Sequence, residues 1–291
     1  MERTYGAQGM VGKLRRVVMR QPDEAMATAD PAVWHYASHV DIDKARAAHE
    51  TFAEQLADWG CEVIYHDAPL PEHSDSVFVF DPALVTDAGT MVLRMGKQLR
   101  RGEEEPLAAC LEASGVPVLA RLEGEATCEG GDTMWMDHDT LAVGLGFRTN
   151  PEAIRQLRAA LEPVGITVLD YDLPYFTGPE ACLHLLSLIS PLAADLAVAY
   201  PPLMPTAFWK ALMERGMKLI EVPYDEFYKT QATNILAVEP GRVIMLDGNP
   251  VTQKALLDAG CEVRTFPGAD LSFLTEGGPT CLTRPVLRDE P

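Results

Sequence analysis

The chain has 291 residues, of which 47% are hydrophobic and 23% charged, an ordinary composition for a globular protein with a substantial core. Its 43 acidic and 24 basic residues give a formal net charge of −19, and a field of that sign repels nucleic acids and anionic membranes while it attracts cations. No run approaches the roughly 18 uncharged apolar residues of a membrane-spanning helix, and the first residues lack the pattern of a secretory signal, so we expect a cytoplasmic protein that binds neither nucleic acid nor membrane.

Strands and helices are expected to alternate along the chain. The expected strands, in order, are Leu14–Met19, Met91–Leu93, Leu141–Val143, Leu196–Ala199 and Val243–Leu246. The expected helices cover 41–59 and 103–114, begin at Asn150-Pro151, end at Leu212, and begin at Asn249-Pro250. Asn150 and Asn249 each precede a proline suited to the first helical turn, which predicts that both residues cap their helices.

One pattern recurs five times: Leu, three residues, Gly, two residues, then Val or Leu. The copies begin at Leu56, Leu111, Leu161, Leu212 and Leu256, and their glycines are 55, 50, 51 and 44 residues apart. In each copy we interpret Leu as the last core-facing residue of a helix. The Gly would then end that helix in the left-handed conformation, and the aliphatic residue would start a buried strand.

Five such units predict an α/β fold in which five similar blades close into a ring, a five-bladed α/β propeller with pseudo-fivefold symmetry. The whole chain, 1–291, would form this single domain, and closure would leave no exposed sheet edge. An open doubly wound sheet also explains the order of helix, glycine and strand, but it does not explain five equal copies. The sequence contains neither a G-x-G-x-x-G fingerprint nor a P-loop.

Polar residues interrupt the repeats in four segments. The first runs from Asp75 to Asp81 and reads as a fully buried strand with an acid at each end; either the acids bind a partner or they are turn and cap residues. The second runs from Cys128 to Asp132, where two glycines between acids either let the backbone approach a ligand or make a plain hairpin turn. The third holds His184 in an apolar run, as either a core histidine or a general acid/base.

The fourth segment contains Cys281, which follows a glycine-rich turn near the end of the chain. The six cysteines include no C-x-x-C pair, and the seven histidines show no zinc-finger spacing, so we expect no metal site and reduced thiols. Cys61 and Cys261 occupy the same place in two repeats, one residue after the glycine, which indicates a structural use. Cys281 lies outside the repeats and is the candidate nucleophile.

Taken together, these segments resemble the guanidine-modifying superfamily, whose members have the pentein five-bladed fold, and most of all the bacterial dimethylarginine dimethylaminohydrolases. The likeness runs from about Val17 to Thr283. The family's motifs D-S-V-F-V-E-D, R-x-G, R-R-G-E, E-x-G-D, R-T-N, L-H-L and G-G-x-x-C match, in the same order, Asp75–Asp81, Arg94–Gly96, Arg100–Glu103, Glu129–Asp132, Arg148–Asn150, Leu183–Leu185 and Gly277–Cys281.

The resemblance implies a role for each matching residue. Cys281 would be the nucleophile, His184 its acid/base partner, and Glu129 the residue that orients His184. Asp81 would bind the guanidinium and Asp75 the α-amino end of the substrate. A substrate carboxylate would be held by arginines, namely Arg100 and Arg148, with Arg94 as a further candidate.

One residue departs from the family pattern. Phe80 stands where the dimethylarginine enzymes usually carry Glu, so it is expected to contact the substrate as an apolar ring. This places methylated arginine in doubt as the substrate and leaves room for a differently substituted guanidine. The large helical insertion of arginine deiminases is not apparent.

The implied activity is hydrolysis of a C–N bond in arginine or an N-substituted arginine through a covalent S-alkylthiouronium on Cys281, without a metal or organic cofactor. Two alternatives stay open: an amidinotransferase, which would pass the amidino group to an amine, and a non-catalytic binding protein of the same fold. The family suggests a homodimer. The loops around 20–40 and 170–180 are expected to shape access to the site.

Overall fold

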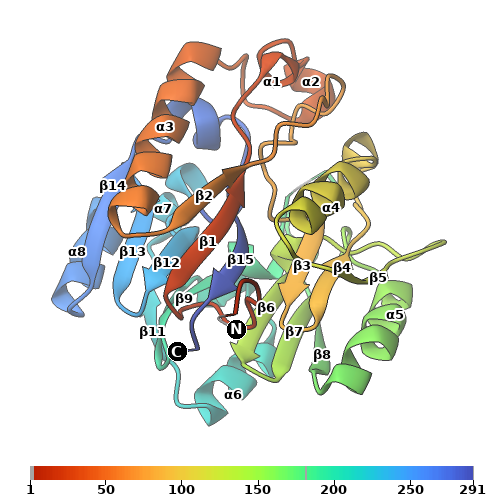
Figure 1. Ribbon diagram of the computed structural model, residues 1–291. Helices are drawn as coiled ribbons and strands as arrows, with labels where there is room; N and C mark the ends of the chain where they lie inside the picture. Colours follow the sequence, from red (N-terminus) through yellow and green to blue (C-terminus); the bar gives the residue numbers. More distant parts are fainter. Residues whose placement is uncertain (1–2, 181, 291) are drawn as a thin grey trace.

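The computed structural model describes residues 3–180 and 182–290, and in this part of the chain fifteen strands form five three-stranded sheets of one design (Figure 1). The sheets are β15 (Arg284–Arg288), β1 (Leu14–Met19) and β2 (Glu62–Tyr65); β3 (Ala83–Thr86), β4 (Gly89–Val92) and β5 (Val118–Arg121); β6 (Thr133–Asp137), β7 (Thr140–Leu145) and β8 (Thr167–Asp172); β9 (Ile189–Ala193), β10 (Leu196–Ala199) and β11 (Lys218–Glu221); and β12 (Ile235–Glu239), β13 (Arg242–Leu246) and β14 (Glu262–Phe266).

In every sheet the middle strand pairs antiparallel with one neighbour and parallel with the other. A helix of nine or more residues lies between each middle strand and its parallel neighbour, and these helices are α3 (Ile42–Asp58), α4 (Glu104–Ala113), α5 (Pro151–Leu161), α6 (Thr206–Glu214) and α8 (Pro250–Asp258). Between β1 and β2 two shorter helices precede α3. The first sheet takes its antiparallel strand from the other end of the chain, since β15 pairs with β1 (Figure 1). The prediction of five similar α/β units is therefore confirmed.

The recurring Leu–Gly pattern has a single physical cause. At all five glycines φ lies between 75° and 91°, and the five leucines are at most 1% exposed. In each copy the amide after the glycine donates to the carbonyl of the leucine at 3.0–3.1 Å, as Cys61 does to Leu56. This is the six-residue bond that ends a helix when a left-handed residue follows it. The helix ends predicted from the sequence are confirmed.

The two predicted asparagine caps had different outcomes. Asn150 accepts from the amide of Ala153 at 3.0 Å, so its capping role is confirmed. Asn249 occupies the N-cap position before Pro250, as predicted, but its side chain makes no such bond, and that part of the prediction is wrong. Its side chain amide instead donates to the carbonyl of Thr230, and the first amides of α8 are capped by the carboxylate of Glu226, which accepts from Val251 at 2.8 Å. A residue distant in sequence thus took the place of the local cap.

The segment from Asp75 to Asp81 was expected to be a buried strand, and this is wrong in part. It is buried throughout, but it runs as successive turns, with the amide of Phe78 donating to the carbonyl of Asp75 at 2.9 Å. Further along, the amide of Phe80 donates to the carbonyl of Cys281 at 3.2 Å. The apolar residues of this segment correctly predicted that it is buried. Packing against distant parts of the chain buries it, however, and not membership of a sheet.

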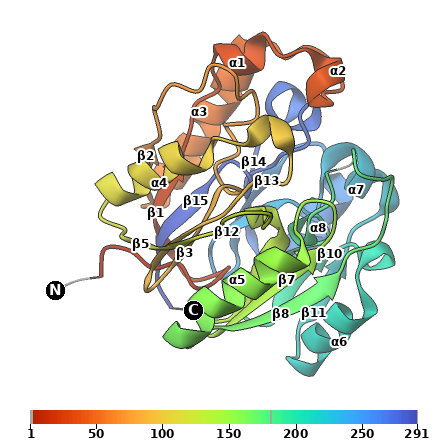
Figure 2. The same cartoon turned by 90° about the vertical axis from the view of Figure 1, so that its right-hand side faces the viewer.

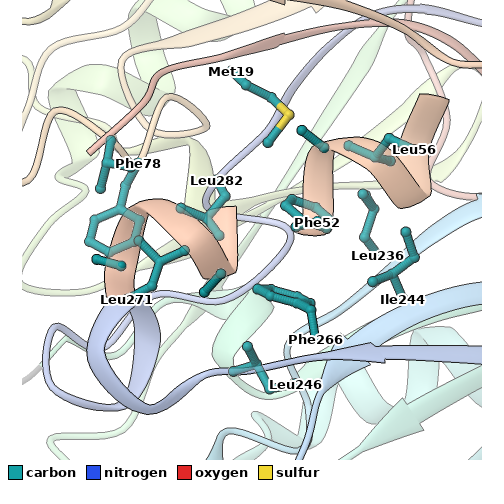
Figure 3. Packing of buried hydrophobic residues seen from close by; sticks show 14 of the residues in the cluster. Met19, Phe52, Leu56, Phe78, Leu236, Ile244, Leu246, Phe266, Leu271 and Leu282 are labelled. Atoms are coloured by element: carbon teal, nitrogen blue, oxygen red, sulfur yellow. The ribbon is translucent and has the colours of Figure 1, made fainter. Parts of the chain in front are cut away.

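Several apolar clusters lie between the helices and the sheets. In the largest, Phe52 of α3 stacks on Phe266 of β14, with ring centroids 4.7 Å apart (Figure 3). Leu56 of α3 and Ile244 of β13 belong to the same cluster. On the other side of the molecule α5 and α6 lie on the outer side of their own sheets (Figure 2).

Three shorter helices stand apart from the repeated unit: α1 (Glu24–Ala27), α2 (Pro31–Trp34) and α7 (Tyr224–Thr230). Among the described residues, no helix combines the length and the apolar character needed to cross a membrane.

Candidate active site

A cavity of about 230 Å³ lies beside the beginnings of five strands, one from each sheet. It is lined by residues from the segments just before β3, β6, β9, β12 and β15, one for each sheet. Eight of the nine predicted site residues line it: Asp75, Phe80, Asp81, Arg100, Glu129, Arg148, His184 and Cys281. The ninth, Arg94, does not; its Nη1 donates to the carbonyl of Ala126 at 3.2 Å.

His184 and Glu129 form a buried pair. Nε2 of His184 is 2.7 Å from Oε2 of Glu129, whose side chain is fully buried. The other carboxylate oxygen accepts from the amide of Lys97 at 2.8 Å, and Arg148 lies 3.5 Å away. A Cβ at position 131 would overlap the His184 ring, so Gly131 permits this close approach.

Each member of this pair shifts the pKa of the other in the direction that favours its charged form. Burial by itself would raise the pKa of Glu129, but the hydrogen bond from His184 and the positive charges of His184 and Arg148 hold that pKa well below its usual range. Burial would likewise lower the pKa of His184, but the Cys182 sulfur and the carboxylates of Asp132 and Glu129 hold it well above its ordinary value. These charges favour the imidazolium form of His184, and Nδ1 is the nitrogen that Glu129 does not bind.

Cys281 lies in the turn that precedes β15. Nδ2 of Asn234 donates to its sulfur at 3.3 Å, and Oδ1 of Asn234 accepts from the amide of Thr280 at 3.1 Å. A Cβ at Gly278 would overlap the Asn234 side chain, which explains a glycine there. Burial, with the nearby charge of Asp81, raises the pKa of the Cys281 thiol to about 11, although Asn234 and the Gly278 amide act in the opposite direction. This shift favours the protonated thiol at neutral pH.

Asp81 belongs to a buried ionic cluster. Its Oδ2 accepts from Nη1 of Arg100 at 2.6 Å, and its Oδ1 accepts from the amide of Gly131 at 2.9 Å. Arg100 also donates through Nε and Nη2 to Glu103, at 3.1 and 2.8 Å, and to the carbonyl of Phe78. The guanidinium of Arg100 is therefore engaged by the protein at every nitrogen, a different setting from the predicted contact with a substrate carboxylate.

Asp75 is also bound within the protein. Its Oδ1 accepts from the hydroxyl of Tyr36 at 2.7 Å, and its Oδ2 accepts from Nζ of Lys97 at 2.6 Å. Phe80 is among the residues that line the cavity, and the guanidinium carbon of Arg284 lies 3.7 Å from the centroid of its ring.

Four residues at the site were missed in the sequence: Lys97, Asn234, Tyr36 and Cys182. Cys182 carried a local signal, since it stands two residues before His184, and its Sγ lies 3.8 Å from Nδ1 of that residue. Lys97 also carried one, because it lies between the motifs Arg94–Gly96 and Arg100–Glu103. Tyr36 and Asn234 reach the site from positions whose neighbours in sequence match no motif.

The two loops expected to shape access both reach the cavity. Trp34, His35 and Phe176 line it, and Nε2 of His35 is 2.9 Å from Oε2 of Glu180, which joins the loops. Across residues 3–180 and 182–290, no group of three or more His, Cys, Asp or Glu side chains is placed to hold a metal ion. The arrangement can bind a cation between carboxylates, attack it with a thiol and protonate a leaving group.

Comparisons with known proteins agree over almost the whole chain. The family model described as N,N dimethylarginine dimethylhydrolase, eukaryotic, matches residues 24–288. The N(G),N(G)-dimethylarginine dimethylaminohydrolase of Pseudomonas aeruginosa is 28% identical over 271 residues, covering 92% of this chain and 98% of that protein. The protein of the same name from Streptomyces coelicolor is 28% identical over 272 residues, covering 92% and 96%. A solved structure of a Pseudomonas aeruginosa variant complexed with citrulline aligns with a TM-score of 0.79 and 25% identity, covering 94% of this chain and all of that one.

Proposed function

Because the chain belongs to the N,N-dimethylarginine dimethylhydrolase family of the guanidine-modifying superfamily, we propose that it hydrolyses a C–N bond of a guanidino compound through a covalent intermediate on Cys281. The products would be a ureido compound and an amine or ammonia. The observation that carries this proposal is the cavity that combines a thiol, an imidazolium held by a carboxylate, and the buried Asp81.

The proposal includes the architecture. The five sheets would be the blades of a pseudo-fivefold α/β propeller formed by the whole chain as one domain. Two features support this: the strand from the end of the chain completes the first sheet, and each sheet contributes the segment before its first strand to the same cavity. A ring of blades brings such segments together at its axis.

Binding of the substrate would activate the nucleophile. The cationic guanidinium would lie against Asp81, whose carboxylate oxygens keep acceptor sites beyond those used by Arg100 and Gly131. Its positive charge would favour the thiolate of Cys281, which burial disfavours in the empty site, and the proton of the thiol would be released to solvent because His184 already carries one. The apolar ring of Phe80 would exclude water from this side.

Catalysis would proceed in two halves. The thiolate would attack the guanidinium carbon to form a C–S bond, and His184 would give its proton to the departing nitrogen as the C–N bond breaks. The neutral His184, held by Glu129, would then take a proton from water; the resulting hydroxide would attack the same carbon and the C–S bond would break. Thiolate, imidazolium and a ureido product are regained.

The test is the Cys281→Ser variant, with Cys110→Ser as the control because Cys110 lies on α4 outside the cavity. Purified proteins are incubated with arginine, methylated arginines and shorter guanidino acids, and ureido product is measured colorimetrically. We expect product from the wild type and the control, and none from Cys281→Ser. Product formed by Cys281→Ser at the wild-type rate would refute the assignment. Formation of ornithine when glycine is added to arginine would instead identify an amidinotransferase.

A further inference from the structure

The far end of the cavity already contains an ammonium group supplied by the protein. Nζ of Lys97 lies 2.6 Å from Oδ2 of Asp75, and the two side chains are only 14% and 7% exposed. The same nitrogen donates to the carbonyl of Trp34 at 3.0 Å and stands 5.1 Å from the centroid of that indole ring. A carboxylate, a carbonyl and an aromatic face are together a complete site for an ammonium group.

Lys97 is held firmly in that position. Its main chain amide donates to Glu129 at 2.8 Å, so the residue is attached to the catalytic pair at one end and to Asp75 at the other. Moving its ammonium away would leave Tyr36 as the only hydrogen-bond partner of the buried Asp75 carboxylate among the described residues, with Arg100 as a more distant positive charge. Leaving a buried charge without its counter-ion is strongly unfavourable, so we expect the pair to persist when a ligand binds.

This arrangement changes what the cavity can accept. The resemblance assigns Asp75 to the α-ammonium of an amino acid substrate, but such a group would meet the like charge of Lys97 at that carboxylate. A ligand carboxylate would be attracted instead, since an ammonium has three donors and only two of those of Lys97 have acceptors in the described structure. Arg148 lines the same cavity, and its acceptor there is Glu129 at 3.5 Å.

Glu276 lines the cavity, but burial raises the pKa of its carboxyl, so its repulsion of an anion is weakened.

We propose, as a refinement that rests on the proposed function, that the substrate is an ω-guanidino carboxylic acid without an α-ammonium group. Lys97 supplies within the protein the cation that an arginine-like substrate would bring to Asp75. Lys97 and Arg148 then bind the carboxylate, while the guanidinium lies at Asp81 and Cys281.

The experiment compares arginine with 5-guanidinopentanoate, which differs from it only by lacking the α-ammonium. Calorimetric titrations use the full-length Cys281→Ser protein, so that binding is measured whether or not the wild type turns these compounds over. We expect 5-guanidinopentanoate to bind at least about tenfold more tightly than arginine. Introducing Lys97→Met into the same protein should reverse the preference, because it frees Asp75, whereas Lys210→Met on exposed α6 should leave it unchanged.

Equal or tighter binding of arginine in the parent protein would overturn the proposal. A Lys97→Met change that weakens both ligands by the same factor would also overturn it, since it would indicate a structural role only. Wild-type protein that binds 5-guanidinopentanoate selectively but releases no ureido product from any guanidine would refute the proposed hydrolysis while leaving this selectivity standing.

Discussion

Replacing Glu129 by glutamine tests how the histidine is kept protonated. The change preserves size and keeps an oxygen for the amide of Lys97, but it removes the negative charge 2.7 Å from Nε2 of His184. A hydrogen bond to a charged group contributes about 1.5–3 kcal/mol, which corresponds to roughly one to two pKa units at the histidine. Less of the imidazolium would then be available to protonate the leaving nitrogen.

We therefore expect Glu129→Gln to lower kcat for ureido product by roughly 10- to 100-fold, the loss that corresponds to one to two pKa units at the general acid. The pKa of His184, followed by NMR of the resting protein, should fall by about one to two units. Glu125→Gln is the matched control, since this side chain stands in the same loop but is exposed. An unchanged His184 titration in a correctly folded Glu129→Gln protein would refute the electrostatic account of this pair.

Three further outcomes are expected. Alkylation of Cys281 in the free protein, read by mass spectrometry, should accelerate about tenfold per pH unit up to about pH 10, because burial raises the thiol pKa to about 11; a plateau below pH 8 would contradict this. Asn234→Ala should lower kcat about tenfold and move the alkylation profile to higher pH, since its amide donates to the sulfur; an unmoved profile would argue against a positioning role. In urea unfolding, Leu256→Ala should cost about 2–5 kcal/mol, whereas Leu257→Ala, 53% exposed, should cost under about 0.5 kcal/mol; similar losses would contradict the predicted helix face.

The repeated unit was readable from sequence because its determinants are local. The bond from Cys61 to Leu56 that ends α3 spans six residues, and the left-handed residue between them is a glycine in every copy. The spacing of Leu and Gly along the chain was therefore sufficient to predict the five helix ends. The prediction for the Asn249 side chain failed for the opposite reason. There a carboxylate from α7, which the local pattern does not include, replaced the expected cap.

The sequence by itself also identified eight of the residues that line the cavity, because their types and order match a known family. It could not determine how the charges pair. Asp75 pairs with Lys97, 22 residues away, and the Cys281 sulfur accepts from Asn234, 47 residues away. Asp75 and Lys97 flank β3 and β4 of one sheet, whereas Asn234 and Cys281 precede strands of two different sheets. In both cases the partners meet only in the folded chain, and a charge in a sequence does not specify which opposite charge it will reach. Only the tertiary structure determined that Lys97 neutralises Asp75, and the class of substrate that we infer follows from this pairing.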